Sequence, residues 1–237
     1  MLRRAHLALL LALCLAGCAA QARTQVHVVG TLYRRHEQVK VFDLAALSRL
    51  LTAIDPDVLV LDVTPAELEA RRVSPGKIEY PGAVFPFLRG RHRVYAAEPA
   101  EPTFSQIVNA VAAAHRRFES ERPAAAAALE QMTEATYAAL QHHWRSTADV
   151  QGEVTGRVLA GKRVFEASLV GPARAAGQDR WDRHTASVVL RAAGENPGKR
   201  ILVLVGIENR HEVLRLLAAE PAIDLVDMER WLSRASL

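Results

Sequence analysis

The sequence has very little cysteine. Its two cysteines, among 237 residues, are Cys14 and Cys18, and both lie near the amino terminus. The chain after residue 18 therefore has no thiol and can form no disulfide of its own. Its stability has to come from a hydrophobic core rather than from cross-links. Half of the residues are hydrophobic, which is enough for one sizeable core in a chain of this length.

A strong excess of one charge is also missing. Lys and Arg number 30 against 26 Asp and Glu, and the formal net charge is +4. This small excess is not the electrostatic footprint of a nucleic-acid-binding protein, so we expect no nucleic-acid partner. The chain contains no G-x-S-x-G turn, no complete P-loop motif and no G-x-G-x-x-G. These absences argue against a serine hydrolase, an NTPase and a dinucleotide-binding enzyme.

The first residues have the pattern of a bacterial secretion signal. Arg3 and Arg4 form a positive start, and the apolar run from Leu7 to Leu15 is too short to span a bilayer as a mature helix. The run ends in Leu15-Ala16-Gly17-Cys18, which resembles the lipobox of bacterial lipoproteins. In that motif the cysteine is lipidated and becomes the first residue of the mature protein. An ordinary signal peptide, cut after a small residue, is the alternative.

The lipobox resemblance sets the expected localisation. We expect residues 1–17 to be a signal peptide, Cys18 to carry the lipid, and residues 18–24 to be a tether. Ala19 follows the cysteine, where an Asp would resemble a signal for retention in the inner membrane. The expected location is therefore the periplasmic face of the outer membrane, with the membrane itself as a partner through the lipid anchor.

Four short apolar runs, each followed by polar residues, predict a parallel β-sheet. They cover Gln25–Val29, Val58–Val63, Arg93–Ala97 and Ile201–Val205. In open α/β sheets the ligand crevice lies beyond the carboxyl ends of the strands. The residues that these ends would bring to one rim are Tyr33, His36, Asp62, Glu98, Glu208, Asn209 and His211.

Helical periodicity fills most of the remaining chain. Asp43 has the side chain of an N-cap for a helix to Ile54, and Thr64-Pro65 predicts a helix through about Arg72. The glycine-rich segment 149–178 has weak periodicity and is expected to be a loop or a short β-hairpin. The other expected elements are a broken helix over 78–91, an αα-hairpin over 103–146, a helix over 181–193, a helix over 210–219, an edge strand over 223–226 and a closing helix over 228–234.

The pattern as a whole predicts an α/β fold. A mostly parallel sheet would be flanked by helices, with the helical hairpin at about 103–146 inserted in the domain or laid over the sheet. We find no internal repeats and no sign of a second domain, so residues 25–237 are expected to form one domain.

Three segments in this order resemble the TraB/ChaN/erythromycin-esterase-like superfamily. VHVVGTLY resembles its opening strand and GxxH turn, in which Gly30 is the glycine. DVLVLDVTPAEL resembles its second strand, which usually ends in Glu. WDRHTASVVLRAAGENPGKRILVLVGIENRHEVLRLL resembles a stretch in which an aromatic residue and an Arg precede a helix, a GK turn and a strand ending in VGAGH.

The resemblance implies a cleft built from a first-turn His, a Glu after the second strand and a His after the late strand. In some relatives this cleft binds a divalent metal and hydrolyses peptide or ester bonds, and in others it is proposed to bind haem or iron. The chain departs from the pattern at all three positions, where Tyr33, Asp62 and Asn209 stand instead. Because Tyr and Asn are poor ligands for zinc-like ions, a divalent metal or haem is only one of the alternatives.

The nearby His36 and His211 could replace the missing histidines, so the candidate catalytic residues are His36, Asp62 and His211. The simpler interpretation is that both histidines are ordinary loop or helix-start residues. Asp62 closes a wholly apolar strand and needs a partner there. The resemblance, which places an Arg near that point, favours Arg183 or His184. The candidate ligand-binding residues are Gly30, Tyr33, Glu98, Arg183, His184, Glu208 and Asn209.

Three functions follow as alternatives. The first, which we favour, is an outer-membrane lipoprotein that binds haem, a metal or a small polar molecule and is non-catalytic or weakly catalytic. The second is a metal-dependent hydrolase of peptide or ester bonds with a shifted site, in which acidic and basic groups must lie within hydrogen-bond reach of one another. The third is a structural or assembly lipoprotein that acts through the helical hairpin.

Overall fold

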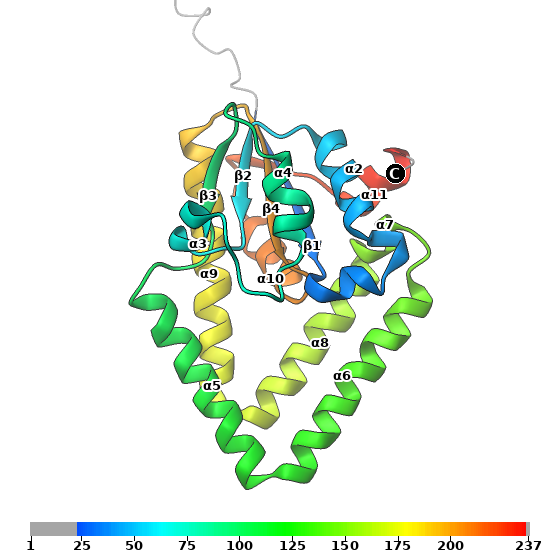
Figure 1. The fold of residues 1–237 in the computed structure, drawn as a ribbon, viewed down its shortest axis with the longest axis vertical. Helices are drawn as coiled ribbons and strands as arrows, with labels where there is room; N and C mark the ends of the chain where they lie inside the picture. Colours follow the sequence, from blue (N-terminus) through cyan, green and yellow to red (C-terminus); the bar gives the residue numbers. More distant parts are fainter. Residues whose placement is uncertain (1–22, 236–237) are drawn as a thin grey trace, which may run out of the picture.

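The computed structural model describes residues 23–235, so the leader, Cys18 and most of the tether lie outside the described residues. Its centre is a sheet of five strands in the order β3-β2-β4-β1-β5, and every neighbouring pair is parallel. The α/β fold expected from the sequence is confirmed (Figure 1). The strands are β1 (Thr24–Thr31), β2 (Val58–Leu61), β3 (Arg93–Ala96), β4 (Arg200–Gly206) and β5 (Ile223–Leu225).

Helices cover both faces of the sheet. The larger core cluster packs α2 (Leu44–Ile54), α7 (Thr147–Val150) and α11 (Met228–Ala235) on one face. The smaller cluster packs α9 (Pro172–Glu195) and α10 (Ile207–Leu217) on the other. Alternation along the strands produces the two cores, because Val29 of β1 belongs to the first cluster while Val28 belongs to the second.

The short helices near the sheet begin where the sequence predicts. The Asp43 side chain accepts a hydrogen bond of 2.8 Å from the Ala46 amide and caps α2. Thr64 and Glu67 form a reciprocal capping box at α3 (Pro65–Ala70). The broken helix expected over 78–91 is observed as η3 (Tyr80–Val84) followed by α4 (Phe85–Phe87). Two short helical turns, η1 (Tyr33–Glu37) and η2 (Lys40–Phe42), join β1 to α2.

The connection from β3 to β4 forms a helical arm beyond the carboxyl edge of the sheet. Its helices are α5 (Thr103–Glu121), α6 (Pro123–His143), α8 (Glu153–Val170) and the first half of α9. The expected helix pair over 103–146 is present and breaks at Pro123, the first residue of α6. Its two helices diverge from a common tip (Figure 1), because α5 packs mainly on α9 and α6 packs on α8.

The prediction of a loop or β-hairpin over 149–178 is wrong, because that segment forms α7, α8 and the first turns of α9. The cause is an inverted pattern in α8. Lys162 and Glu166 are buried in the arm, whereas Val164 and Phe165 are 72% and 47% exposed. A helix with charges inside and apolar side chains outside lacks the apolar stripe that predicts a helix. Within the described residues, no helix has both the length and the apolar character needed to cross a membrane.

Candidate functional site

The carboxyl ends of four strands meet at one edge of the sheet, as the parallel pattern predicts. Tyr33, Asp62, Glu98 and Glu208 follow β1, β2, β3 and β4 in turn. The Tyr33 hydroxyl donates a hydrogen bond of 2.6 Å to Asp62 Oδ2. Tyr33 reaches this position from a left-handed backbone conformation, with φ at 53°. The ring also lies against Gly206, where an added Cβ would be 2.4 Å from its hydroxyl oxygen.

Beneath Tyr33 lies a buried group of charged side chains, which we call the acidic cluster: Asp62, Glu79, Glu98 and Lys77. The Lys77 ammonium donates a hydrogen bond of 2.5 Å to the Asp62 carbonyl oxygen and contacts the Glu98 carboxyl. The side chains of Lys77 and Glu98 are only 12% and 6% exposed. One ammonium group therefore faces three carboxyls in a site that is largely shielded from water.

This imbalance of charge changes the acidity of the cluster. Burial, with the charge of Asp62 adding to it, raises the pKa of Glu98 from an ordinary 4.5 to about 8. Burial also raises the pKa of Glu79 to about 7. Neither carboxyl oxygen of Glu79 has a hydrogen-bond partner among residues 23–235, and the same is true of the Tyr80 hydroxyl. The cluster thus keeps protons at a pH where exposed carboxyls have lost them.

A second polar network joins the sheet edge to the helical arm. Glu208, in the first turn of α10, accepts hydrogen bonds of 2.8 Å from the Tyr137 hydroxyl on α6 and 3.0 Å from Lys162 on α8. Glu166 on α8 pairs with Lys162 at 3.5 Å and with Arg174 on α9 at 3.0 Å. These contacts hold α6, α8 and α9 in fixed positions above the strand ends.

Two adjoining cavities lie between the sheet edge and the arm, and together they form what we call the cleft. The polar lobe has a volume of about 590 Å³ and is bounded by Arg34, Arg35 and Lys77 as well as by Tyr137 and Glu208. The apolar lobe, of about 400 Å³, runs between α5 and α9. The residues that line both lobes are Tyr33, Arg174, Gln178 and Asn209.

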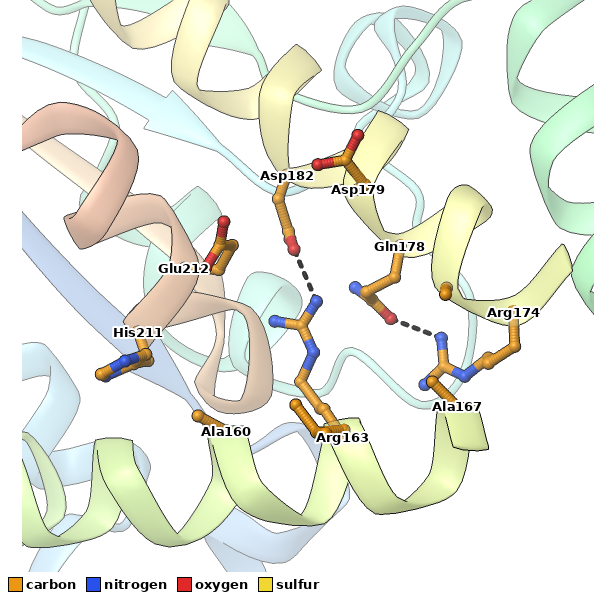
Figure 2. Close-up of a pocket in the computed structure, with 11 residues that line it drawn as sticks. Ala160, Arg163, Ala167, Arg174, Gln178, Asp179, Asp182, His211 and Glu212 are labelled. Carbon is orange, nitrogen blue, oxygen red and sulfur yellow. Dashed lines mark hydrogen bonds and ion pairs between the residues drawn. The ribbon is translucent and has the colours of Figure 1, made fainter. Parts of the chain in front are cut away.

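A third and smaller cavity, of about 210 Å³, lies between α8, α9 and α10. Figure 2 shows Arg163 reaching from α8 toward Asp182 on α9, with a contact of 2.5 Å, and Arg174 paired with Gln178. Asn209 also donates a hydrogen bond of 2.7 Å to Asp182. This cavity is therefore walled by ion pairs and hydrogen bonds that are already satisfied.

The two histidines of the expected catalytic set do not face the cleft. His36 is 1% exposed; its Nε2 accepts a hydrogen bond of 3.1 Å from the Leu32 amide, and its Nδ1 lies 2.6 Å from the Phe42 carbonyl. Both ring nitrogens are thus used to hold the turn after β1. His211 lies on α10 against Gly156, and its ring points away from the Arg163–Asp182 pair in Figure 2. The histidines do not approach Asp62 as the sequence interpretation required.

The sequence interpretation also gave the wrong partners for Asp62, namely Arg183 and His184. Arg183 is exposed and pairs with Asp179 one turn earlier in α9, and His184 lies on the same helix outside the cleft. Tyr33 is the partner instead. Gly30 is a packing residue, because an added Cβ would lie 2.3 Å from Ile207 Cδ1. Its amide and carbonyl groups are both bonded to the Gln151 side chain, at 2.8 and 2.9 Å.

Helix α10 begins at Ile207, three residues before the predicted start, so Glu208 and Asn209 lie in its first turn. The residues of the cleft, the acidic cluster and the second polar network that the sequence interpretation missed come from the arm and from the loop before η3. Neither region has a recognisable motif. The only early signal was the mixture of charges within the apolar helices of the arm. The missed residues are Lys77, Glu79, Tyr137, Lys162, Arg174 and Gln178.

The side chains at the cleft do not fit a metal ion or a haem iron. Among residues 23–235, no three His, Cys, Asp or Glu side chains converge in a geometry that could hold a metal ion. The Lys77 ammonium beside Asp62 also disfavours a second cation there. For haem, the Tyr33 hydroxyl is bonded to Asp62 and its pKa is raised well above the ordinary value, mainly by burial. The one histidine that lines the cleft, among residues 23–235, is His115, and its imidazole already contacts Glu166 at 3.3 Å rather than facing the cavity as a free iron ligand.

Comparison with known proteins found no family model, no curated protein and no solved structure that matches this chain. The superfamily resemblance described above therefore stays a prediction, and the cleft has to be interpreted from its own side chains.

Proposed function

We propose that the protein is a lipid-anchored envelope protein that binds a small anionic molecule in the cleft. The observation that carries this proposal is the charge of the polar lobe. Four cationic side chains, Arg34, Arg35, Lys77 and Arg174, and one carboxylate, Glu208, line it. Three of the four cations are paired with acidic side chains outside the lining, namely Glu134, Glu98 and Glu166, so Arg34 carries the uncompensated charge. An anion that enters this lobe gains favourable electrostatic interactions before any specific contact is made.

The availability of Arg34 supports the proposal. Arg35 is paired with Glu134 at 2.6 Å but remains at the surface, stacked 4.0 Å from the centre of the Tyr137 ring. Arg34 is exposed and has no ion-pair partner among residues 23–235. It is therefore the cation most able to bind an incoming anion without first losing a protein contact. The tyrosines at the lobe, Tyr33 and Tyr137, add hydroxyl groups that can donate or accept hydrogen bonds.

The direction of the chain supports an anchor at Cys18. Strand β1 begins at Thr24, at the amino edge of the sheet, and the cleft and the helical arm lie at the opposite edge (Figure 1). A lipid attached six residues before β1 would leave the cleft open toward the periplasm. The metal-dependent hydrolase is not proposed, since its candidate histidines lie elsewhere and the donor set does not fit a metal.

Replacing Arg34 by glutamate is expected to weaken anion binding by about tenfold or more, because the change reverses a charge at the mouth of the lobe. Isothermal titration of the domain without its leader, with inorganic phosphate and with short carboxylates, measures the effect. Arg72→Glu is the matched control, since Arg72 is also exposed but does not line the cleft. Equal binding by the two variants, or tighter binding of ammonium ligands than of anions, would contradict the proposal.

Replacing Cys18 by alanine is expected to release the protein from the membrane fraction. The lipid supplies the anchor, and a chain without it has only soluble contacts. Fractionation and intact-mass measurement of the wild-type and Cys18→Ala proteins, expressed in a Gram-negative host, test this. Cys14→Ala is the control because Cys14 lies within the leader and is removed with it. Membrane association of Cys18→Ala with an unchanged mass would rule out the anchor.

A further inference from the structure

We propose that the ligand is an anionic amphiphile with one unbranched apolar chain, held with its head in the polar lobe and its chain in the apolar lobe. This inference rests on the proposed function, which requires only an anion, and it adds the chemical class of the remainder of the ligand. Its basis is that a cavity lined by cationic side chains joins, at four shared side chains, a second cavity that has an apolar wall from α5 and α9.

The apolar lobe has the lining that a hydrocarbon chain requires. Helix α5 supplies Ile107, Val108 and Val111 to one wall, and α9 supplies Trp181 to the other. Val108 is 39% exposed, although most valines of the domain are buried. An apolar chain that covered Val108 and its neighbours would remove this surface from water.

Helices α5 and α9, which supply the apolar wall, approach each other closely at one residue of the lobe. At Gly177 of α9, an added Cβ would lie 2.4 Å from Val111 Cγ2 on α5, so the helices nearly touch there. Gly177 is therefore the point at which α5 and α9 close against each other beside the apolar lobe. The aromatic contact of Phe104 with Trp181, at 5.8 Å between ring centres, lies on the same pair of helices.

The junction between the lobes determines which end of the ligand goes where. Arg174 lines both lobes, and Glu166 holds its guanidinium group at 3.0 Å. The remaining cations of the cleft lie on the other side of this junction, at Arg34, Arg35 and Lys77. An anionic head is therefore stabilised in the polar lobe, while the apolar lobe accepts the chain from the junction outward.

The experiment titrates the leader-free domain with straight-chain carboxylates from acetate to decanoate, below their micellar concentrations. Each added methylene is expected to tighten binding by about fourfold until the apolar lobe is full. Octylammonium, which has the same chain as octanoate with the opposite charge, is expected to bind at least tenfold more weakly. Val108→Asp should remove most of the dependence on chain length and leave acetate binding within about twofold.

Val154→Asp is the matched control for this variant. Val154 is 51% exposed on α8 and lines neither lobe, so the same substitution there should leave the dependence on chain length unchanged. Both valines are at the surface, and circular dichroism will establish that both variants fold.

The outcomes separate the two proposals. Equal affinity for acetate and octanoate, with Arg34→Glu still weakening both, would overturn the amphiphile and leave the anion-binding function intact. Octylammonium binding as tightly as octanoate would overturn the anion-binding function itself. An absence of binding by any carboxylate up to 10 mM, roughly the limit of specific recognition, would overturn the amphiphile, and phosphate titration would then decide the broader function.

Discussion

Replacing Lys77 by methionine is expected to lower the free energy of unfolding by about 1–3 kcal/mol, the typical cost of leaving a buried hydrogen-bond acceptor without its donor. Lys77 contacts the carboxyl of Glu98 and the carbonyl oxygen of Asp62, and its side chain is 12% exposed. Methionine keeps the length of the apolar stem but leaves the Glu98 carboxyl and the Asp62 carbonyl oxygen without their hydrogen-bond donor. Urea unfolding followed by circular dichroism measures the change.

Lys199→Met is the matched control for Lys77→Met. Lys199 is 58% exposed and lies 3.8 Å from Asp57, and a surface pair of this kind contributes less than about 1 kcal/mol. A loss at Lys77 no larger than the loss at Lys199 would show that the acidic cluster does not depend on the ammonium group.

The variant Glu98→Gln tests whether Glu98 holds a proton in the folded state. The direction of the expected change in stability follows from the coupling between proton binding and folding. Because the folded pKa of Glu98 is raised to about 8 from an ordinary 4.5, the folded state holds a proton that the unfolded state has lost. This contribution to stability is complete below about pH 4.5 and is lost as the pH rises toward 8. Glutamine cannot lose a proton, so the variant should gain stability relative to the wild type between pH 5 and 8, by up to about 1.4 kcal/mol per pH unit. A difference that stays constant with pH would contradict this assignment.

Substituting Gly206 by alanine is expected to cost about 1–3 kcal/mol of stability, as overpacking of a well-packed site does, and to weaken ligand binding. The added Cβ would lie 2.4 Å from the Tyr33 hydroxyl oxygen and 3.0 Å from Cζ. The ring has to move, and the hydrogen bond of 2.6 Å to Asp62 is lost with it. Because Tyr33 lines both lobes of the cleft, thermal unfolding and anion titration should change together.

Two variants show whether the Tyr33 ring is the cause. Gly161→Ala is the control for the substitution itself, since an added Cβ at Gly161 of α8 meets no atom within 4 Å. Alanine should stabilise that helix by up to about 1 kcal/mol. In a Tyr33→Phe background, which removes the nearest clashing atom, Gly206→Ala should cost less than in the wild type. Equal costs in both backgrounds would locate the strain elsewhere.

Local features of the sequence were enough to predict the sheet and its rim. The apolar runs of β1, β2 and β4 and the cap of α3 depend only on neighbouring residues, because burial on both faces and capping geometry are local requirements. Parallel strands share the direction of their carboxyl ends, so the meeting of Tyr33, Asp62, Glu98 and Glu208 at one edge followed from the parallel direction of the strands, without knowledge of their order.

The partners of those residues depended on the tertiary structure. Asp62 is bonded to Tyr33 rather than to Arg183, because the left-handed turn at Tyr33 and the missing side chain at Gly206 bring the phenol across the strand ends. His36 lies only three residues from Tyr33, yet its ring turns inward to satisfy the Leu32 amide and the Phe42 carbonyl. Whether a histidine ring faces a ligand site or bonds a buried backbone group depends on the packing around it, and the spacing of residues in the sequence does not describe that packing.

The helical arm contains both helices that the local sequence predicts and a helix that depends on contacts with distant residues. Helices α5 and α6 were predictable from local pattern, since their apolar residues recur at helical spacing. It did not determine α8, whose Lys162 and Glu166 become inner residues only because Glu208 and Arg174, from two other helices, neutralise them. Burial of a charge is stable only with a partner from elsewhere in the chain. The helical state of this segment and the position of the cleft therefore depend on long-range contacts that the local sequence does not contain.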